Sequence, residues 1–108
     1  MSASSDDSRR SALDETVTSW PDVRAKPVFG HRAWVRNGSM FGFLADSGVA
    51  VKLIAPIDPA DVLARDGVEL FAYGGKRMAG WAVLPLRDDA ELDEAVQLVH
   101  TAFEAVVG

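Results

Sequence analysis

The sequence contains no cysteine, and this absence excludes several kinds of chemistry at once. Without thiols the chain cannot form disulfides, use a thiolate nucleophile or hold zinc through sulfur. Only two histidines are present. His31 has no other strong metal ligand implied nearby, and we expect His100 to pack against the sheet edge. We therefore expect no metal site and no bound cofactor.

Long apolar runs are also missing. No run approaches the roughly 20 residues that are needed to span a bilayer, and residues 1–10 lack the apolar core of a secretion signal. We expect a cytoplasmic protein that does not act at a membrane. A chain of 108 residues forms one domain and buries about two-thirds of its unfolded surface. The sequence predicts a flexible N-terminal tail over residues 1–9 and a single domain over residues 10–108.

Two segments each lack charge of one sign. The segment from Val23 to Ala45 has no acidic residue and four basic ones, whereas the segment from Asp88 to the end has six acidic residues and no Lys or Arg. The net charge of −5 argues against general nucleic-acid binding, because phosphate backbones favour basic surfaces. Two interpretations are open: two solvated faces of one domain, or a basic sheet surface for an anionic or acidic partner.

The first half of the chain reads as one helix followed by strands. Apolar residues three and four positions apart up to Trp20 predict a helix over about residues 10–19, which Pro21 ends. Asn37-Gly38 is a strong hairpin signal between strand-like residues 23–36 and 40–45. The first of these is one long strand or two short ones, broken at Gly30. Residues 49–54 form the next strand.

The second half of the chain also combines predicted helices and strands. Asp58 is placed as a helix N-cap and Pro59 as the first helical residue, which predicts a short helix over residues 59–66. Strands follow over residues 68–73 and 80–84, joined by a flexible basic loop. The last helix covers residues 89–107, capped by Asp88 or Asp89. The order α-β-β-β-α-β-β-α predicts a two-layer α+β fold with a five-stranded antiparallel sheet and helices on one face.

Strand alternation indicates which side chains share a face. It places Lys52 on the more open side of its strand, and it places Arg32, Trp34 and Arg36 together on one face of the first strand. We expect these four residues to bind a protein partner or a second copy of the chain on an uncovered sheet face. The alternative is that Trp34 belongs to the core and that the alternation slips at Gly30.

Two possible catalytic motifs lack residues or positions that their chemistry requires. Ser39, His31 and Asp46 could be written as a triad, but Ser39 lies in a hairpin turn rather than at a strand-to-helix elbow. Residues 75–80 have the glycine spacing of a phosphate loop, but Trp81 follows where that loop requires lysine. We therefore expect no catalytic and no cofactor-binding residues, and a protein that is not an enzyme.

Several short motifs occur in a characteristic order over about residues 10–107. They are Lys26-x-x-Phe29-Gly30, Asn37-Gly38-Ser39-Met40-Phe41, an apolar strand with Lys52, and Phe71 ahead of Gly75-Lys76-Arg77-Met78-Ala79-Gly80. In this order the chain resembles the TfoX/Sxy N-terminal domain family. It departs from the family pattern at Val28, where methionine is common, and at Lys52, where arginine is usual.

The resemblance implies a two-layer domain with an antiparallel sheet, similar to secretion chaperones, and no catalytic residues. Two-domain members of that family regulate competence genes, while stand-alone members, which this chain resembles, mostly have no established activity. We expect a non-enzymatic interaction or regulatory module that acts through a protein or self contact on its sheet face. The alternative is a nucleic-acid-associated transcriptional or competence regulator.

Overall fold

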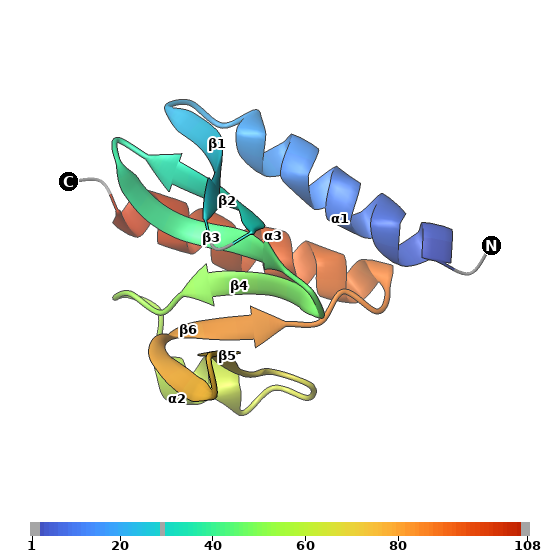
Figure 1. The fold of residues 1–108 in the computed structure, drawn as a ribbon, viewed down its shortest axis with the longest axis vertical. Helices are drawn as coiled ribbons and strands as arrows, with labels where there is room; N and C mark the ends of the chain where they lie inside the picture. Colours follow the sequence, from blue (N-terminus) through green and yellow to red (C-terminus); the bar gives the residue numbers. More distant parts are fainter. Residues whose placement is uncertain (1–2, 29, 107–108) are drawn as a thin grey trace.

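The computed structural model describes residues 3–28 and 30–106, which form three helices and six strands. Figure 1 shows their arrangement. In chain order the elements are α1 (Ala3–Thr18), β1 (Val23–Val28), β2 (His31–Arg36), β3 (Ser39–Ala45), β4 (Gly48–Lys52), α2 (Pro59–Leu63), β5 (Glu69–Tyr73), β6 (Lys76–Leu84) and α3 (Asp89–Ala105).

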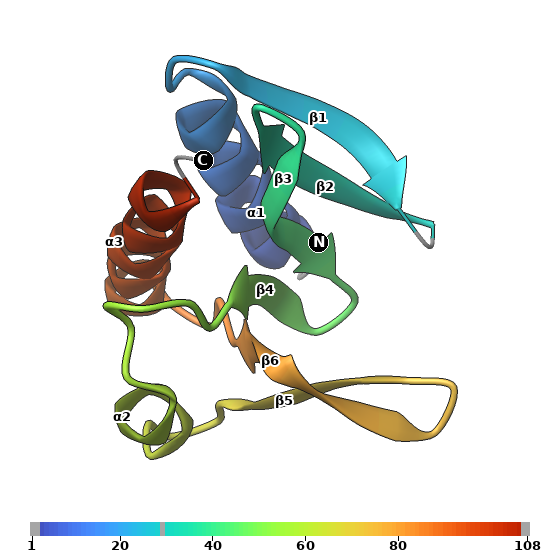
Figure 2. The same ribbon diagram turned by 90° about the vertical axis from the view of Figure 1, so that its left-hand side faces the viewer.

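All six strands belong to one antiparallel sheet in the order β1-β2-β3-β4-β6-β5. The helices α1 and α3 lie side by side on one side of this sheet (Figure 2), with α1 against β1 and α3 against β3 and β4. The predicted α+β class with an antiparallel sheet is confirmed. The predicted number of five strands is wrong, because residues 23–36 form two paired strands on either side of Gly30.

The chain is helical well before the predicted start near residue 10. Residues 3–9, where a flexible tail was expected, belong to α1, which begins at Ala3. Two arginine side chains hold this helix in place: Arg9 Nε donates to the carbonyl of Leu86, in the segment after β6, at 2.6 Å, and Arg10 Nη1 donates to the carbonyl of Ala45, at the end of β3, at 2.5 Å. Residues 1–2, and residue 107 at the predicted end of the last helix, lie outside the described residues.

The predicted turn and capping residues occupy the positions expected of them. Asn37-Gly38 has φ of 50° and 85° and closes the β2–β3 hairpin, a conformation that asparagine and glycine adopt most readily. Asp58 caps α2 and Asp88 caps α3, each by accepting a backbone N–H of the first turn. The helix α2 ends at Leu63, three residues earlier than predicted.

The expected flexible basic loop before the last strand is wrong. Gly74-Gly75 makes a two-residue turn with φ of 60° and 81°, and β6 begins directly after it at Lys76. Most of the segment that was read as a loop is therefore paired strand. Glycine spacing and basic residues indicated flexibility, whereas the two positive φ angles make a tight hairpin.

The main core lies between the sheet and the helices, and Phe103 of α3 is central to it. Its ring centroid is 5.6 Å from that of Phe41 and 5.1 Å from that of Trp20. On another side the Arg36 guanidinium lies 4.1 Å from the centroid of the same ring. Phe103 thus connects α3, the sheet and the segment that follows α1.

We expect Phe103→Ala to lower the free energy of unfolding by about 3–5 kcal/mol, because it removes a 5% exposed aromatic side chain and leaves a cavity. Denaturant titration followed by circular dichroism measures this loss. The exposed Glu94 on the same helix is the matched control, and Glu94→Ala should change stability by less than about 0.5 kcal/mol. A loss below about 1 kcal/mol for Phe103→Ala would show that α3 is not held by this contact.

Candidate functional site

The face of the sheet opposite α1 and α3 carries a second apolar cluster, and we call this surface the open face. No described helix covers it. The strand residues buried on it are Ala33, Phe43, Ala45, Ala50 and Val83, and the partly buried residues that pack against them are Val28, Met40, Phe71 and Trp81. These residues are screened from solvent mainly by one another, so the open face is apolar without being part of the main core.

The sheet curls around the open face. In Figure 2 the β1–β2 and β5–β6 hairpins both extend away from α3, one at each end of the sheet. A register shift in β3 contributes: Trp34 pairs with Gly42 while Val35 pairs with Met40, so Phe41 is an extra residue. Such bulges increase the local twist of a sheet. A second irregularity lies between β5 and β6.

Four rings from four different strands meet on the open face. The Phe43 ring centroid lies 5.4 Å from that of His31, 4.9 Å from that of Phe71 and 5.3 Å from that of Trp81. His31 also makes an edge contact with Phe71 at 6.1 Å, which joins β2 to β5 across the curled sheet. We call these four residues the aromatic cluster. Edge-to-face contacts at such distances stabilise aromatic groups beyond the area they bury.

Basic side chains surround the aromatic cluster. Strand alternation and pairing place four of them on the open face, and we call them the basic rim: Arg24, Lys26, Lys52 and Lys76. Glu69 is the single acidic residue within the six strands, and its pairing with Val83 places it on the open face as well. The helix α3 on the other side carries five acidic residues and no Lys or Arg. Charge is therefore separated between the two layers of the domain.

Trp34 does not lie on the open face, so the prediction that it binds a partner there is wrong. Its side chain is fully buried in the main core, facing the helices. The indole Nε1–H donates to the Asp14 Oδ1 of α1 at 2.9 Å, and the ring stacks on Phe41. Gly42 makes room for it, since a Cβ at that position would meet the Trp34 ring at 3.0 Å.

Arg32 and Arg36 share the face of Trp34, as the alternation predicted, and no slip occurs at Gly30. The assignment of that face as uncovered was wrong. Arg32 Nε donates to Asp14 Oδ1 at 2.7 Å, and Arg36 Nη1 donates to the Phe103 carbonyl at 2.9 Å. Both arginines extend to groups of the helical layer, where a charged head can lie beside a covered tryptophan. Of the four predicted residues, only Lys52 belongs to the open face.

The residues that do form the aromatic cluster were mostly missed by sequence reasoning. The sequence predicts no partner-binding role for Phe43, Phe71 or Trp81. The sequence signal that could have placed Phe43 on the open face is its alternation with Ala33 of β2. The two residues are paired, and paired residues lie on the same face of a sheet. The bulge at Phe41 hides that signal, since it puts one extra residue between neighbouring positions.

A pocket of about 410 Å³ opens at one end of the aromatic cluster. Its lining includes His31, Asp46, Glu69, Phe71 and Tyr73. Ser39 is not part of it: Ser39 pairs with Arg36 at the other end of β2, five residues from His31. That separation is about 16 Å along a strand. The three residues that could be written as a triad are therefore not brought together.

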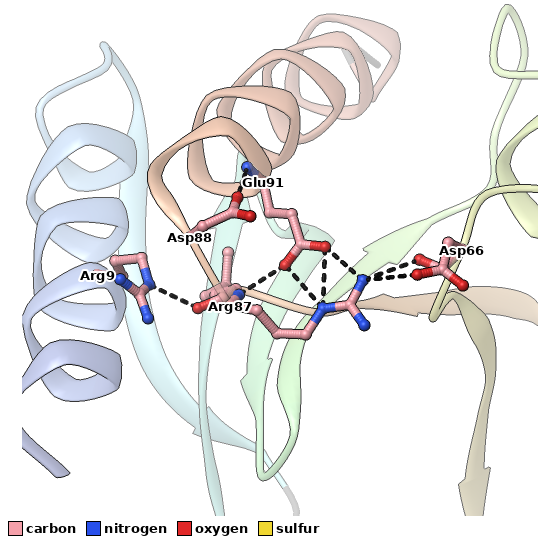
Figure 3. Close-up of polar contacts among 6 residues, drawn as sticks. Arg9, Asp66, Arg87, Asp88 and Glu91 are labelled. Atoms are coloured by element: carbon pink, nitrogen blue, oxygen red, sulfur yellow. Dashed lines mark hydrogen bonds and ion pairs between the residues drawn. The ribbon is translucent and has the colours of Figure 1, made fainter. Parts of the chain in front are cut away.

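A larger cavity of about 530 Å³ lies between α3 and the segment that leads into β5. Arg87 occupies its charged wall and binds Glu91 and Asp66 (Figure 3), with 2.5 Å between Arg87 Nη2 and Glu91 Oε2 and 3.2 Å between Nη2 and Asp66 Oδ2. Hydrogen bonds from Arg87 lower the pKa of Glu91 below its ordinary value. These contacts tie two loops together, so we interpret this cluster as structural.

The described part of the chain holds no group of three or more His, Asp or Glu side chains arranged to bind a metal ion. Nor is any described helix long and apolar enough to cross a bilayer.

No protein-family model, curated protein or solved structure matches this chain. The resemblance to the TfoX/Sxy N-terminal domain family therefore stays a prediction that rests on its motifs. The structure shows where those motifs lie: Asn37-Gly38 closes the β2–β3 hairpin, Lys52 ends β4, and residues 75–80 form the β5–β6 turn and the start of β6.

We expect Glu91→Gln to lower the melting temperature at pH 7, because it removes the charge that Arg87 binds. A carboxylate whose pKa is lowered by folding stabilises the fold above its ordinary pKa, and this contribution is lost as the pH falls through the lowered value. The difference between wild type and variant should therefore shrink below about pH 4. Calorimetry at several pH values measures it, and a difference that grows toward acid pH would contradict the assignment.

Proposed function

We propose that this chain is a non-enzymatic interaction module that binds a protein partner on its open face. The observation that carries the proposal is the aromatic cluster, which no described helix covers and which has four basic side chains and one acidic one, Glu69, around it on the same face. A partner that fits this surface is a segment with large apolar side chains and neighbouring acidic ones. Its apolar groups would contact Phe71 and Trp81, and its carboxylates would lie near Lys52 and the rest of the basic rim.

The distribution of apolar and charged groups favours a protein partner over nucleic acid. An apolar centre with a polar rim is the usual composition of a protein interface. A face for nucleic acid would instead carry a continuous basic surface, because phosphate contacts supply most of the affinity. On the open face the centre is aromatic and aliphatic, and the basic residues lie around it.

The charge separation between the layers supports an acidic partner and a defined orientation. Complementary charge steers association and rejects wrongly oriented partners more than it adds affinity. The acidic face of α3 would repel the segment that the open face attracts. The partner would therefore approach from the sheet side.

The motif resemblance supports the same kind of role. A stand-alone chain similar to the TfoX/Sxy N-terminal domain would act as a regulatory contact module in the cytoplasm, without catalytic residues. This part of the proposal rests on the order of the motifs in the sequence. The contact surface rests on the residues of the open face.

The three tryptophans provide a direct test. Trp81 lies on the open face, whereas Trp34 is buried and bonded to Asp14, and Trp20 packs on the helical side. Titration with a synthetic peptide of alternating Asp and Leu should shift the indole N–H resonance of Trp81 in two-dimensional NMR. The indole signals of Trp34 and Trp20 should stay in place. A peptide with Lys in place of Asp should bind more weakly.

Charge reversal provides the matched control. Lys52→Glu should weaken peptide binding about three- to tenfold, because one rim charge changes from attractive to repulsive. Arg65→Glu, which reverses a charge beside α2 away from the open face, should leave binding unchanged. Shifts at α3 or at Trp20 in place of Trp81, or equal binding of acidic and basic peptides, would show that the open face is not the docking surface.

The basic rim also makes nucleic acid the second candidate ligand. We expect no complex with single- or double-stranded DNA tighter than about the micromolar, sequence-independent range at physiological salt, since the acidic helical layer repels phosphate. Fluorescence anisotropy with labelled oligonucleotides measures this. Nanomolar, sequence-dependent binding would overturn the protein-partner proposal in favour of a nucleic-acid-associated regulator.

A further inference from the structure

The two edges of the sheet differ in how well they are protected. The strand β1 has Pro27 and the charged Lys26, and both are typical devices that prevent an edge from pairing with another chain. The strand β5, Glu69–Tyr73, has no proline and is uncharged from Leu70 onward. No described strand pairs with its outer side, because β5 stands last in the sheet order.

The turn that closes the β5–β6 hairpin determines which backbone groups point outward. In a hairpin with a two-residue turn, the residues that flank the turn exchange hydrogen bonds, and here these are Tyr73 and Lys76. Because the pattern alternates along a strand, Ala72 directs its N–H and C=O groups to the outer edge. The pairing with β6 shifts between Leu70 and Phe71, but beyond the shift the Gly80 carbonyl accepts from Leu53, directly after β4, and Ala82 points toward β4 in the same way. Val83 therefore faces its partner Glu69 of β5, and Leu70 also points outward. The edge therefore presents two donors and two acceptors in strand geometry.

The same hairpin carries the exposed apolar side chains. Within the described residues, the large hydrophobic side chains that are exposed are Tyr73, at 52%, and Met78, at 41%. Tyr73 lies on β5, and Met78 lies on β6, where it pairs with Phe71. Unpaired strand edges and exposed apolar groups each indicate an interaction surface, and here they coincide.

We infer that β5 pairs in antiparallel fashion with β5 of a second copy of this chain, around a two-fold axis at Phe71. In this register the partner's Ala72 faces Leu70, and the two pairs of this kind form four N–H···O bonds. The partner's Phe71 faces Phe71, an aromatic cross-strand pair of the kind that stabilises sheets. It is the register that uses all five residues of β5.

Charge in this register is self-complementary. Glu69, the single acid of the six strands, faces the partner's Tyr73. The partner's Lys76 lies beside its Tyr73 on the next strand, about 5 Å farther on the same face. Each copy thus brings one acid near one base, and no like charges are directly opposed. An isologous contact of this type closes as a dimer.

The interface is a single short strand pair, so the dimer should be weak. Contacts of this size are typical of weak and transient complexes. We expect a dissociation constant in the micromolar range. This inference does not rest on the proposed function, because it is carried by the backbone edge of β5, although the side chains of Phe71 and Lys76 belong to both surfaces.

The test is analytical ultracentrifugation of the wild-type chain from about 1 µM to about 1 mM, the range in which a weak interface dissociates. The wild type should change from monomer to dimer over this range of protein concentration. Ala72→Pro removes an outward N–H that β6 does not use, and it should weaken dimerisation at least tenfold. Ala72→Ser retains that N–H and should dimerise like the wild type. Circular dichroism checks that each variant is folded.

A charge-reversal cycle keeps the test decisive if the proline variant does not fold. Glu69→Lys and Lys76→Glu should each weaken the dimer, and the double variant should recover it, because the pair is restored between copies. Within one copy Glu69 begins β5, whereas Lys76 of β6 pairs with Tyr73 at the other end of that strand, so recovery reports the contact between copies. A wild type that stays monomeric throughout would overturn the inference. So would a dimer that neither the folded variants nor the single reversals affect.

Discussion

The burial of Trp34 is the contact on which the arrangement of the two layers depends. Its ring fills the space between β2, β3 and the helices, and its indole N–H finds a carboxylate acceptor in Asp14 of α1. The same Asp14 oxygen also accepts from Arg32, so one α1 side chain holds two groups of β2. A buried indole needs such a partner, because an unsatisfied N–H would cost about 1–3 kcal/mol. This contact fixes which face of the sheet the helices cover.

Covering one face leaves the other to be protected by the sheet itself. The bulge at Phe41 and the irregular β5–β6 pairing let the sheet curl, and the curl brings His31 of β2 against Phe71 of β5. Phe43 becomes almost fully buried on a face that no described helix covers. The rest of this apolar surface stays partly exposed between basic side chains. An uncovered apolar centre within a charged rim is the feature that supports a binding role for this domain.

The unprotected edge at β5 follows from the same architecture. At the other end of the sheet, β1 carries a proline and basic residues. The β5–β6 hairpin instead ends in Gly74-Gly75 and exposes Tyr73 and Met78. The open face and the β5 edge therefore lie on the same part of the molecule, since Phe71 belongs to both. Pairing of two β5 strands would place two open faces beside each other in one extended sheet.

The sequence by itself determined the features that depend on neighbouring residues. The Asn37-Gly38 hairpin, the Asp58 cap and the common face of Arg32, Trp34 and Arg36 follow from local φ, capping and alternation. For the last helix the sequence limited the cap to Asp88 or Asp89, and the structure shows Asp88. Which face the helices would cover was decided only by tertiary structure. Alternation shows which residues share a face of the sheet, but it does not show which of the two faces the helices cover. The flanking arginines indicated exposure for Trp34, but their side chains bind Asp14 and the Phe103 carbonyl, which are distant in sequence. The aromatic cluster likewise depends on a bulge and a curl that no local pattern specifies, since both arise when the strands pair.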